Sequence, residues 1–270
     1  MNTILDMINN LQQYKVKEIE ANINIAKDKG TSYNEFINKL LLACLQDERK
    51  SAQNIAKSYI KLREKQLAEQ NRTEILYKRE MELWTSGCIT IVGIDEVGRG
   101  CVAGPVVAGA VILPIEPKIL YLNDSKKLNS LQRERLDDQI RSQAIDYAIG
   151  EVDADVIDDI GIVPATFAAM KNAINNLAIE PEHILVDAFR IPEIITKQTN
   201  IINGDRVSAS IAAASIIAKV YRDSKMKELH NTYPQYGFDS NKGYGTLDHM
   251  DSIREYGLST LHRSSFLKGI

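Results

Sequence analysis

The chain has 270 residues, a length that allows one large domain or two modest ones. Hydrophobic residues make up 44% and charged residues 26%, as in ordinary globular proteins, and the net charge of −3 neither indicates nor excludes a nucleic-acid partner. The three cysteines lack metal-site spacing, which is typical of a reducing compartment. No signal-peptide pattern and no apolar run near the roughly 20 residues of a membrane span is present, so we expect a cytoplasmic protein.

Residues 1–87 differ in composition from the rest of the chain. They contain no proline, glycine occurs only at Gly30 and Gly87, and charges of both signs are dense. Apolar residues recur at helical spacing, at Ile4, Met7, Ile8 and Leu11 and again at Phe36, Leu40, Leu41 and Leu45. Thr31 and Ser32 ahead of Glu35 predict a capped start for the second of these helices.

Residues 51–84 consist almost entirely of strong helix formers. They predict one long, solvated helix with Ile55, Tyr59 and Leu62 on one face. We therefore expect an all-helical N-terminal extension over residues 1–87. Its role stays open between a structural extension and an accessory part in substrate binding.

After Gly87 the sequence alternates between strand and helix patterns. Strands are predicted at 89–95, 106–113, 147–152 and 184–187, with a brief apolar segment at 201–202. Helices are predicted at 130–143, capped by Asn129 or Ser130, and at 154–160, 165–177, 207–229 and 246–255. An aromatic loop is expected at 233–244. This alternation indicates an α/β sheet domain covered by helices.

Carboxylates follow several of the apolar segments. Asp95 and Asp187 end two strands, Glu96 follows Asp95, and Asp205 comes just after the segment at 201–202. Sites gather where strands end, and carboxylates brought together there would repel one another unless a hard cation lay between them. Oxygen ligands of this kind select Mg²⁺ or Mn²⁺. Two such ions, about 3.5–4 Å apart, could clamp a phosphodiester.

Asp95 and Glu96 present a geometric difficulty, because neighbours on a strand point to opposite faces. Both can reach one site only if the strand ends or bends there, and Gly98 and Gly100 would allow that. Alternatively, Glu96 contributes its backbone carbonyl, or its side chain contacts a residue that binds the metal.

The stretch from Asp95 to Gly100, read Asp-Glu-Val-Gly-Arg-Gly, resembles the signature of the type 2 ribonucleases H, and of bacterial ribonuclease HII in particular. The similarity continues in order over roughly residues 88–270, at 103–107, 123–128, 186–188, 204–205, 212–219, 222–223, 241–246, 262–263 and Phe266. The arginine between the glycines separates the chain from ribonuclease HIII, whose corresponding segment lacks it. Cys101 departs from the family pattern, in which proline commonly follows.

The resemblance implies a ribonuclease H-like mixed β-sheet flanked by helices, with a C-terminal helical substrate-binding segment, in a catalytic domain over 88–270. It implies hydrolysis of RNA in RNA–DNA hybrids and incision at single ribonucleotides in duplex DNA. It also implies a metal site for two Mn²⁺ or Mg²⁺ ions, formed by Asp95, Glu96, Asp187 and Asp205. The ribonucleotide would be sensed by Gly98, Arg99, Gly100 and Tyr244, since the 2′-hydroxyl distinguishes RNA from DNA.

Several further residues are candidates for lesser roles. Lys126, Lys127 and Lys242 would contact phosphates, as would Lys219 and Arg222. Asp223 would be an ion-pair partner of Arg222. The pair His262 and Arg263 would either contact the substrate or pack the C-terminal tail.

Two rival functions stay open. One is a hybrid-binding protein that has lost catalysis, and the other is a DNA-directed nuclease of the same fold. We expect a monomer.

Overall fold

The structure, a computed structural model, describes residues 2–27 and 34–267. The predicted cap at Thr31 and Ser32 lies outside the described residues. The chain forms two compact units, Met1–Gln70 and Asn71–Ile270. Residues 71–87, which the sequence pattern assigns to the extension, belong to the second unit by their contacts.

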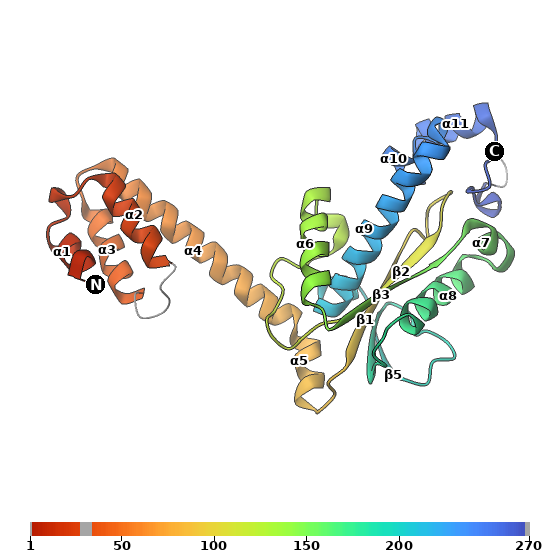
Figure 1. The fold of residues 1–270 in the computed structure, drawn as a ribbon, viewed down its shortest axis with the longest axis horizontal. Helices are drawn as coiled ribbons and strands as arrows, with labels where there is room; N and C mark the ends of the chain where they lie inside the picture. The colour runs from red at the N-terminus through yellow and green to blue at the C-terminus, as the bar shows by residue number, and fades with distance from the viewer. Residues whose placement is uncertain (1, 28–33, 268–270) are drawn as a thin grey trace. The chain divides into compact units, whose positions relative to one another are not determined.

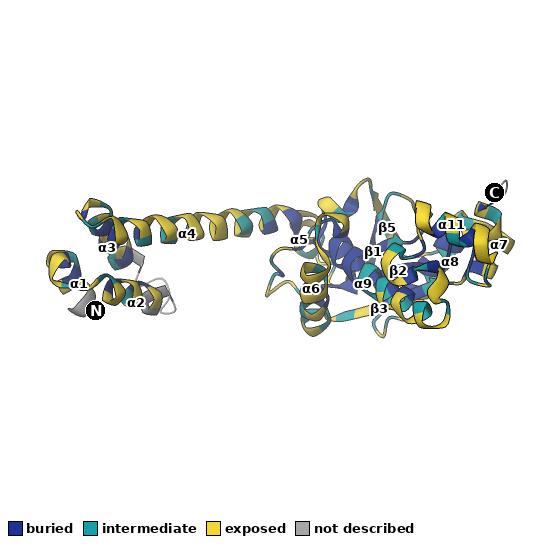
Figure 2. Ribbon diagram, turned by 90° about the horizontal axis from the view of Figure 1, so that it is seen from above, coloured by how far each residue is buried: buried dark blue, intermediate teal, exposed yellow. Residues whose placement is uncertain are grey.

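The first unit is all-helical, as its periodicity predicts. It comprises α1 (Asn2–Asn9), a 3₁₀ turn at Leu11–Gln13, α2 (Val16–Lys27), α3 (Asn34–Gln46) and the first part of α4 (Lys50–Leu76). Met7 and Leu11 are buried together with Leu40 and Leu41 in one apolar cluster, which confirms the face predicted from sequence. Residues 61–70 of α4 are exposed at most positions, so this part of the helix is solvated (Figure 2).

The prediction of a single helix over 51–84 is wrong, because the chain breaks between α4 and α5 (Lys78–Thr85). Tyr77 stands at the break and is fully buried. Its hydroxyl accepts a hydrogen bond of 3.0 Å from the Ile119 backbone N–H. This anchor is a tertiary contact, which the helix-forming composition does not reveal.

A five-stranded mixed sheet forms the centre of the second unit (Figure 1). Its strands are β1 (Ile91–Val97), β2 (Val106–Ile112), β3 (Asp146–Val152), β4 (His183–Asp187) and β5 (Lys197–Ile201). The order is β3-β2-β1-β4-β5. The first three strands are antiparallel neighbours, and β4 pairs in parallel with both β1 and β5. The ends of β1 and β4 therefore lie side by side.

Helices cover both faces of the sheet, which confirms the predicted fold class (Figure 1). They are α6 (Ser130–Gln143), α7 (Ala154–Ile160), α8 (Ile162–Asn175) and α9 (Ala209–Thr232). The helices α10 (Phe238–Asn241) and α11 (Leu247–Tyr256) pack in a separate apolar cluster with Met226 of α9. Short 3₁₀ turns occur at Ser125–Lys127, Gly204–Arg206, Pro234–Tyr236 and Ser264–Phe266. Apolar side chains of α8 pack on one face of the sheet, and those of α6 and α9 on the other.

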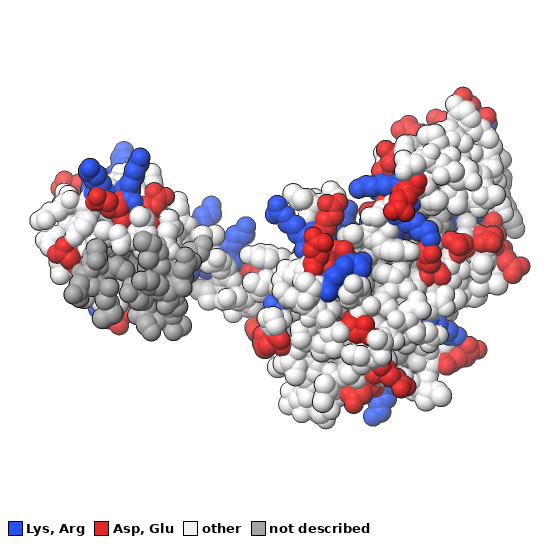
Figure 3. Space-filling view, in the orientation of Figure 1, with Lys and Arg blue, Asp and Glu red and all other residues white. Residues whose placement is uncertain are grey.

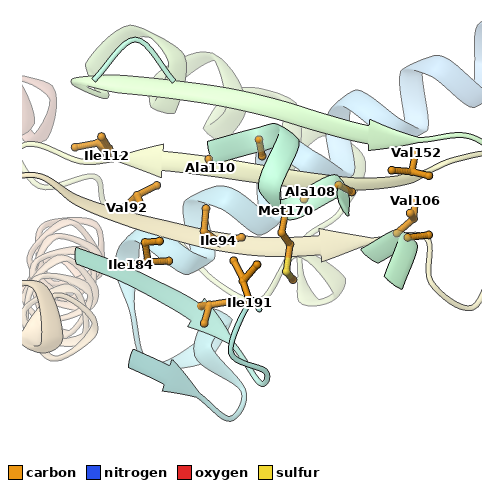
Figure 4. Close-up of a cluster of buried hydrophobic side chains, with 14 of the residues drawn as sticks. Val92, Ile94, Val106, Ala108, Ala110, Ile112, Val152, Met170, Ile184 and Ile191 are labelled. Atoms are coloured by element: carbon orange, nitrogen blue, oxygen red, sulfur yellow. The ribbon is translucent and has the colours of Figure 1, made fainter. Parts of the chain in front are cut away.

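The helix α9 lies unusually close to β1 and β2. A Cβ atom on Gly93 would stand 2.0 Å from the Ser210 carbonyl carbon, and one on Gly109 would stand 2.4 Å from the Ala214 oxygen. Neither strand position therefore has room for a side chain, which accords with the alanine- and serine-rich start of α9. On the opposite face Val92 and Ile94 pack with Met170 of α8 (Figure 4).

Two elements differ from the expected pattern. The strand β5 begins at Lys197 and is mostly polar, whereas only the apolar pair at 201–202 is evident in the sequence. Strands at the edge of a sheet have an exposed side, so polar residues are tolerated there and the apolar signal is weak. The expected aromatic loop at 233–244 contains the short helix α10.

The start of α9 is fixed by a buried acid. Glu80 of α5 is fully buried, and its Oε1 accepts hydrogen bonds from the Ser210 N–H (2.9 Å) and from the hydroxyls of Ser208 and Ser210. A carboxylate suits this position because the free N–H groups of a helix start carry partial positive charge. No helix among the described residues is both long and apolar enough to cross a membrane.

Candidate active site

A cleft of about 250 Å³ opens at the ends of β1 and β4. The four predicted carboxylates, called here the carboxylate quartet, all line it: Asp95, Glu96, Asp187 and Asp205. It is also lined by the predicted ribose-sensing residues, namely Tyr244 and the segment Gly98-Arg99-Gly100, called here the GRG loop. These residues come from four separate parts of the chain, at 95–100, 187, 205 and 244, and meet in one place.

Asp95 and Glu96 obey strand alternation and yet share the cleft. Asp95 is buried on the α9 face, where Ser215 bonds its carboxylate. Glu96 faces α8, because it also borders an apolar hollow that contains Thr166 and Phe167. Strand β1 ends at Val97, one residue beyond Glu96, so both side chains reach the end of the sheet.

Asp187 and Asp205 are held close together by a local hydrogen bond. Asp187 ends β4, and its Oδ1 accepts a 2.6 Å hydrogen bond from the Gly204 N–H. Asp205 follows in a 3₁₀ turn that leads into α9. The Asp187 carboxylate thus fixes the backbone segment that carries Asp205.

The quartet carries more negative charge than its surroundings neutralise. Burial raises the pKa of Asp95 well above its ordinary value, and the charges of Glu96 and Asp187 raise it further. Burial also raises the pKa of Glu96, against the opposing effect of Arg99, whose guanidinium lies 3.1 Å from Glu96 Oε1. The pKa of Asp205 rises from 3.8 to about 6 through burial and then through Asp124 and Asp187.

This donor set suits a hard divalent cation. A cation would relieve the repulsion that raises these pKa values, and carboxylate oxygens are the ligands that Mg²⁺ and Mn²⁺ prefer. Within residues 2–27 and 34–267, no three histidine, cysteine or carboxylate side chains stand close enough to enclose an ion as they are.

Two fully buried arginines support the GRG loop and the segment that follows it. Arg222 of α9 donates to the carbonyls of Ala103, Pro105 and Lys242, at 2.7–3.0 Å. Arg263 donates to the carbonyls of Gly104 and Arg99. Burial lowers the pKa of Arg263 to about 10, so it remains charged at neutral pH. Charged donors make strong hydrogen bonds to carbonyls, and the loop is therefore rigidly supported.

The conformation of the GRG loop depends on its first glycine. Gly98 has a φ of +89°, and a Cβ there would stand 2.3 Å from Arg222 Nε. Cys101, the departure from the family pattern, is buried beneath the loop, with its Sγ 3.8 Å from the Lys242 carbonyl oxygen.

Tyr244 faces the GRG loop across the cleft, and its side chain is 40% exposed. The preceding residue ties the two segments together, because the Gly243 carbonyl accepts hydrogen bonds from the N–H groups of Val102 and Ala103. The ammonium of Lys219 lies 5.8 Å from the centre of the Tyr244 ring. The partly exposed Tyr244 therefore lines the cleft on a backbone that is tied to the segment after the GRG loop.

The candidate phosphate contacts separate into two groups. Lys126 and Lys219 line the cleft, whereas Lys127 and Lys242 are not among its lining residues. The Lys242 ammonium instead donates to the Asp239 carbonyl. On the face drawn in Figure 3, basic side chains are interspersed with acidic ones rather than gathered into one field.

Arg222, also predicted as a phosphate contact, is buried and supports the loop instead. The predicted ion pair of Asp223 with Arg222 is wrong, because Arg222 bonds backbone carbonyls and Asp223 pairs with Lys219 (2.7 Å) and Arg133 (3.8 Å).

Sequence reasoning missed several residues that shape the site. Ser125 and Ser215 line the cleft, with their hydroxyls 3.0 Å apart. Asp124 is buried near Asp205 and pairs with Arg206 at 3.0 Å. All three lie within the stretches 123–128 and 212–219 that resemble the family, and Asp124 follows the apolar run at 119–122 by two residues, so the sequence carried a signal for their positions but none for their roles.

The sheet order, the helices on both faces and the carboxylates at the ends of neighbouring strands define an enzyme of the ribonuclease H-like fold. A family model described as Ribonuclease HII matches residues 92–268, and one described as the Ribonuclease HII N-terminal domain matches residues 15–84. The chain belongs to the ribonuclease HII family, and it is a hydrolase of the endoribonuclease H class.

Curated relatives and solved structures agree with this assignment. The chain is 49% identical over 228 residues to Ribonuclease HII of Desulfitobacterium hafniense (strain DSM 10664 / DCB-2), which covers 84% of this chain and 88% of that protein. It is 45% identical over 256 residues to Ribonuclease HII of Clostridioides difficile (strain 630), with 95% and 97% covered. The crystal structure of ribonuclease H2 from Pyrococcus horikoshii OT3 matches with a TM-score of 0.56 and 26% identity, over 67% of this chain and all of that one.

Proposed function

We propose that this chain hydrolyses the RNA strand of RNA–DNA hybrids and incises duplex DNA at single embedded ribonucleotides. The observation that carries the proposal is the meeting of the carboxylate quartet, the GRG loop and Tyr244 in one cleft. In this cleft, carboxylates that suit divalent ions lie beside a glycine-containing loop. The backbone groups of that loop can hydrogen-bond a sugar hydroxyl. The site thus combines phosphodiester hydrolysis with recognition of ribose.

The proposed cofactors are two Mn²⁺ or Mg²⁺ ions held by the carboxylate quartet. When bound, such ions lower the pKa of an attacking water and stabilise the departing oxygen. The contribution of the chain is to hold its acids at fixed positions. Ser215 holds Asp95, Arg99 holds Glu96, and the Gly204 N–H holds Asp187.

The GRG loop is the proposed reader of the 2′-hydroxyl. Backbone groups exposed by glycines can hydrogen-bond a sugar hydroxyl without contacting the base, so recognition would not depend on base identity. Arg99 is engaged with Glu96, and its guanidinium also lies 5.8 Å from the centre of the Phe189 ring. We therefore assign ribose recognition mainly to the loop backbone and to Tyr244, which can stack against the sugar.

Phosphate contacts are proposed for Lys126 and Lys219, which line the cleft, and more weakly for Lys127 and Lys242. These contacts would position the duplex without selecting a sequence. The proposal includes a monomeric, cytoplasmic enzyme, as expected from the sequence.

The decisive experiment compares wild-type protein with Asp95→Asn on an RNA–DNA hybrid, in Mg²⁺, in Mn²⁺ and in excess chelator. We expect strand cleavage by the wild type with either metal, and none with chelator or with the variant, which loses a charged ligand. Hybrid binding without cleavage in either metal would favour the catalytically silent binder. Equal cleavage of an all-DNA duplex would favour the DNA-directed nuclease.

A further inference from the structure

Two buried histidines lie directly behind Tyr244. His249, in the first turn of α11, and His262, in the C-terminal segment, are 0% and 4% exposed. Their rings pack edge-on against Tyr236 and Phe238, with His262 4.7 Å from the Tyr236 ring centre and His249 5.4 Å from that of Phe238. The pair is thus held in an apolar cluster and takes no direct part in the cleft.

The hydrogen bonds fix the proton positions on both rings. The Ser259 backbone N–H donates to His262 Nδ1 at 3.0 Å, so that nitrogen carries a lone pair. His262 must then carry its proton on Nε2, which lies 3.1 Å from His249 Nε2. His249 Nε2 accepts this bond, which leaves the His249 proton on Nδ1. That N–H points at the Tyr244 carbonyl oxygen, 2.8 Å away.

A second proton on either ring would oppose a donor that the neutral ring accepts. On His262 it would oppose the Ser259 N–H, although the Ser259 hydroxyl, 2.8 Å from Nδ1, could turn to accept it. On His249 it would oppose the His262 N–H. Burial lowers the pKa of His249, and burial followed by the effect of His249 lowers the pKa of His262 to about 4. Both imidazoles are therefore neutral at physiological pH.

The far end of this chain of bonds is attached to the segment that follows the GRG loop. His262 pairs with Ala103 in an isolated antiparallel bridge. On either side of it, Gly104 N–H donates to the Leu261 carbonyl and Arg263 N–H donates to the Val102 carbonyl. The histidine pair therefore connects the segment behind the GRG loop with the backbone of Tyr244.

We propose that His262 and His249 are positioning residues, which form a neutral hydrogen-bond relay that sets Tyr244 at its distance from the GRG loop. The inference rests on the proposed function, in which Tyr244 and the loop together contact the ribonucleotide. The Tyr244 carbonyl also accepts a 2.8 Å hydrogen bond from the Thr246 N–H, and the relay supplies its second donor. The two donors together set the carbonyl, and through it the direction in which the phenol enters the cleft. Small displacements of such a group affect catalysis strongly, since a misplacement of about 1 Å can lower a rate about 100-fold.

A nuclear magnetic resonance measurement tests the relay without any substrate. Long-range ¹⁵N–¹H correlation at pH 7 distinguishes the two neutral tautomers from the imidazolium form. We expect His262 as the Nε2–H tautomer and His249 as the Nδ1–H tautomer, with His183 and His230 as internal references. The opposite tautomer, or an imidazolium, at either position would overturn the relay.

A matched pair of substitutions tests the effect on catalysis. In His249→Asn the amide nitrogen occupies the place of Nδ1 and keeps the donor to Tyr244, whereas in His249→Gln the amide reaches the place of Nε2 and leaves that donor missing. His249→Asn keeps the bond to Tyr244 but leaves the His262 N–H without its acceptor, so on a duplex with one ribonucleotide we expect a loss of about threefold in kcat/KM. For His249→Gln we expect a loss of about tenfold or more, mostly as a rise in KM.

Stability should follow the opposite order. Glutamine fills the histidine volume better than asparagine does, so a purely structural role predicts that His249→Asn is the more damaged variant in both stability and cleavage. Equal losses, or a greater cleavage loss in His249→Asn, would overturn the proposal.

A double-mutant cycle separates this proposal from the proposed function. With Tyr244→Ala as background, the difference between the asparagine and glutamine variants should disappear, because the group that the relay positions is gone. A difference that persists would contradict action through Tyr244. If wild-type protein leaves the ribonucleotide duplex uncut, the proposed function fails, while the tautomers still decide whether the relay exists.

Discussion

Removal of the Asp205 charge should make the metal-free protein more stable and less active at once. The pKa of Asp205 rises from 3.8 to about 6 because of burial and then of the neighbouring Asp124 and Asp187. The difference of about 2 units, at ~1.36 kcal/mol per unit, sets an upper limit of about 3 kcal/mol on the destabilisation by the ionised side chain. Because Asp205 is partly exposed, solvent screening reduces the expected gain in Asp205→Asn to about 1–2 kcal/mol.

The stability difference between Asp205→Asn and wild type should depend on pH. A carboxylate whose pKa is raised by folding destabilises the native state above its folded pKa, and the effect vanishes below its unfolded pKa. The advantage of Asp205→Asn should therefore be full above about pH 6 and should shrink as the pH falls toward 3.8. Addition of Mg²⁺ should stabilise wild type more than the variant, because a bound cation offsets the same repulsion.

Denaturant unfolding followed by tryptophan fluorescence would measure this difference. The single tryptophan, Trp84, lies in the second compact unit and packs near its core, so the signal reports that unit. The exposed Asp155→Asn serves as the control, and we expect a change of less than about 0.5 kcal/mol there. The reasoning is refuted if Asp205→Asn is no more stable than wild type at pH 7.5 in chelator, or if its advantage does not change with pH.

Three further predictions concern the support of the cleft. Gly98→Ala should destabilise the second unit by about 2–4 kcal/mol in urea unfolding, because the φ of Gly98 is +89° and an added Cβ would meet Arg222. The control Gly100→Ala should change the stability little, because no atom lies within 4 Å of an added Cβ there. Arg222→Lys should raise KM for the hybrid and cost about 3 kcal/mol of stability, since lysine cannot reach all three carbonyls. An unchanged KM would argue against support of the loop by Arg222. Lys126→Ala should reduce the slope of log affinity against log salt by about 1, and an unchanged slope would remove it from the phosphate contacts.

The sequence predicts the position of the quartet because the relevant signals are local. Apolar runs that end on Asp95 and Asp187 indicate strand ends, and the ends of parallel neighbours meet at one edge of the sheet. Strand β1 ends at Val97, one residue beyond Glu96, so both neighbours line the cleft from opposite faces, and the ligand role of Glu96 stays a prediction.

Features that depend on distant contacts were not predictable in the same way. The break at Tyr77 requires the Ile119 backbone, and the cap on α9 requires Glu80 from another helix. The open question over His262 has a structural answer, because its ring is buried and bonds to Ser259 and His249. No periodicity in the sequence marks such pairs, since each partner lies far from the other along the chain or in an unrelated element.

The most direct test of the account compares two duplexes that differ in one oxygen atom. One carries a single ribonucleotide and the other carries the deoxyribonucleotide at the same position, and kcat/KM is measured for both in Mn²⁺ or Mg²⁺. A site that reads the 2′-hydroxyl should cut the first at the ribonucleotide at least about 100-fold better than the second. Equal cleavage of the two duplexes would contradict the assignment of ribose recognition to the GRG loop and Tyr244.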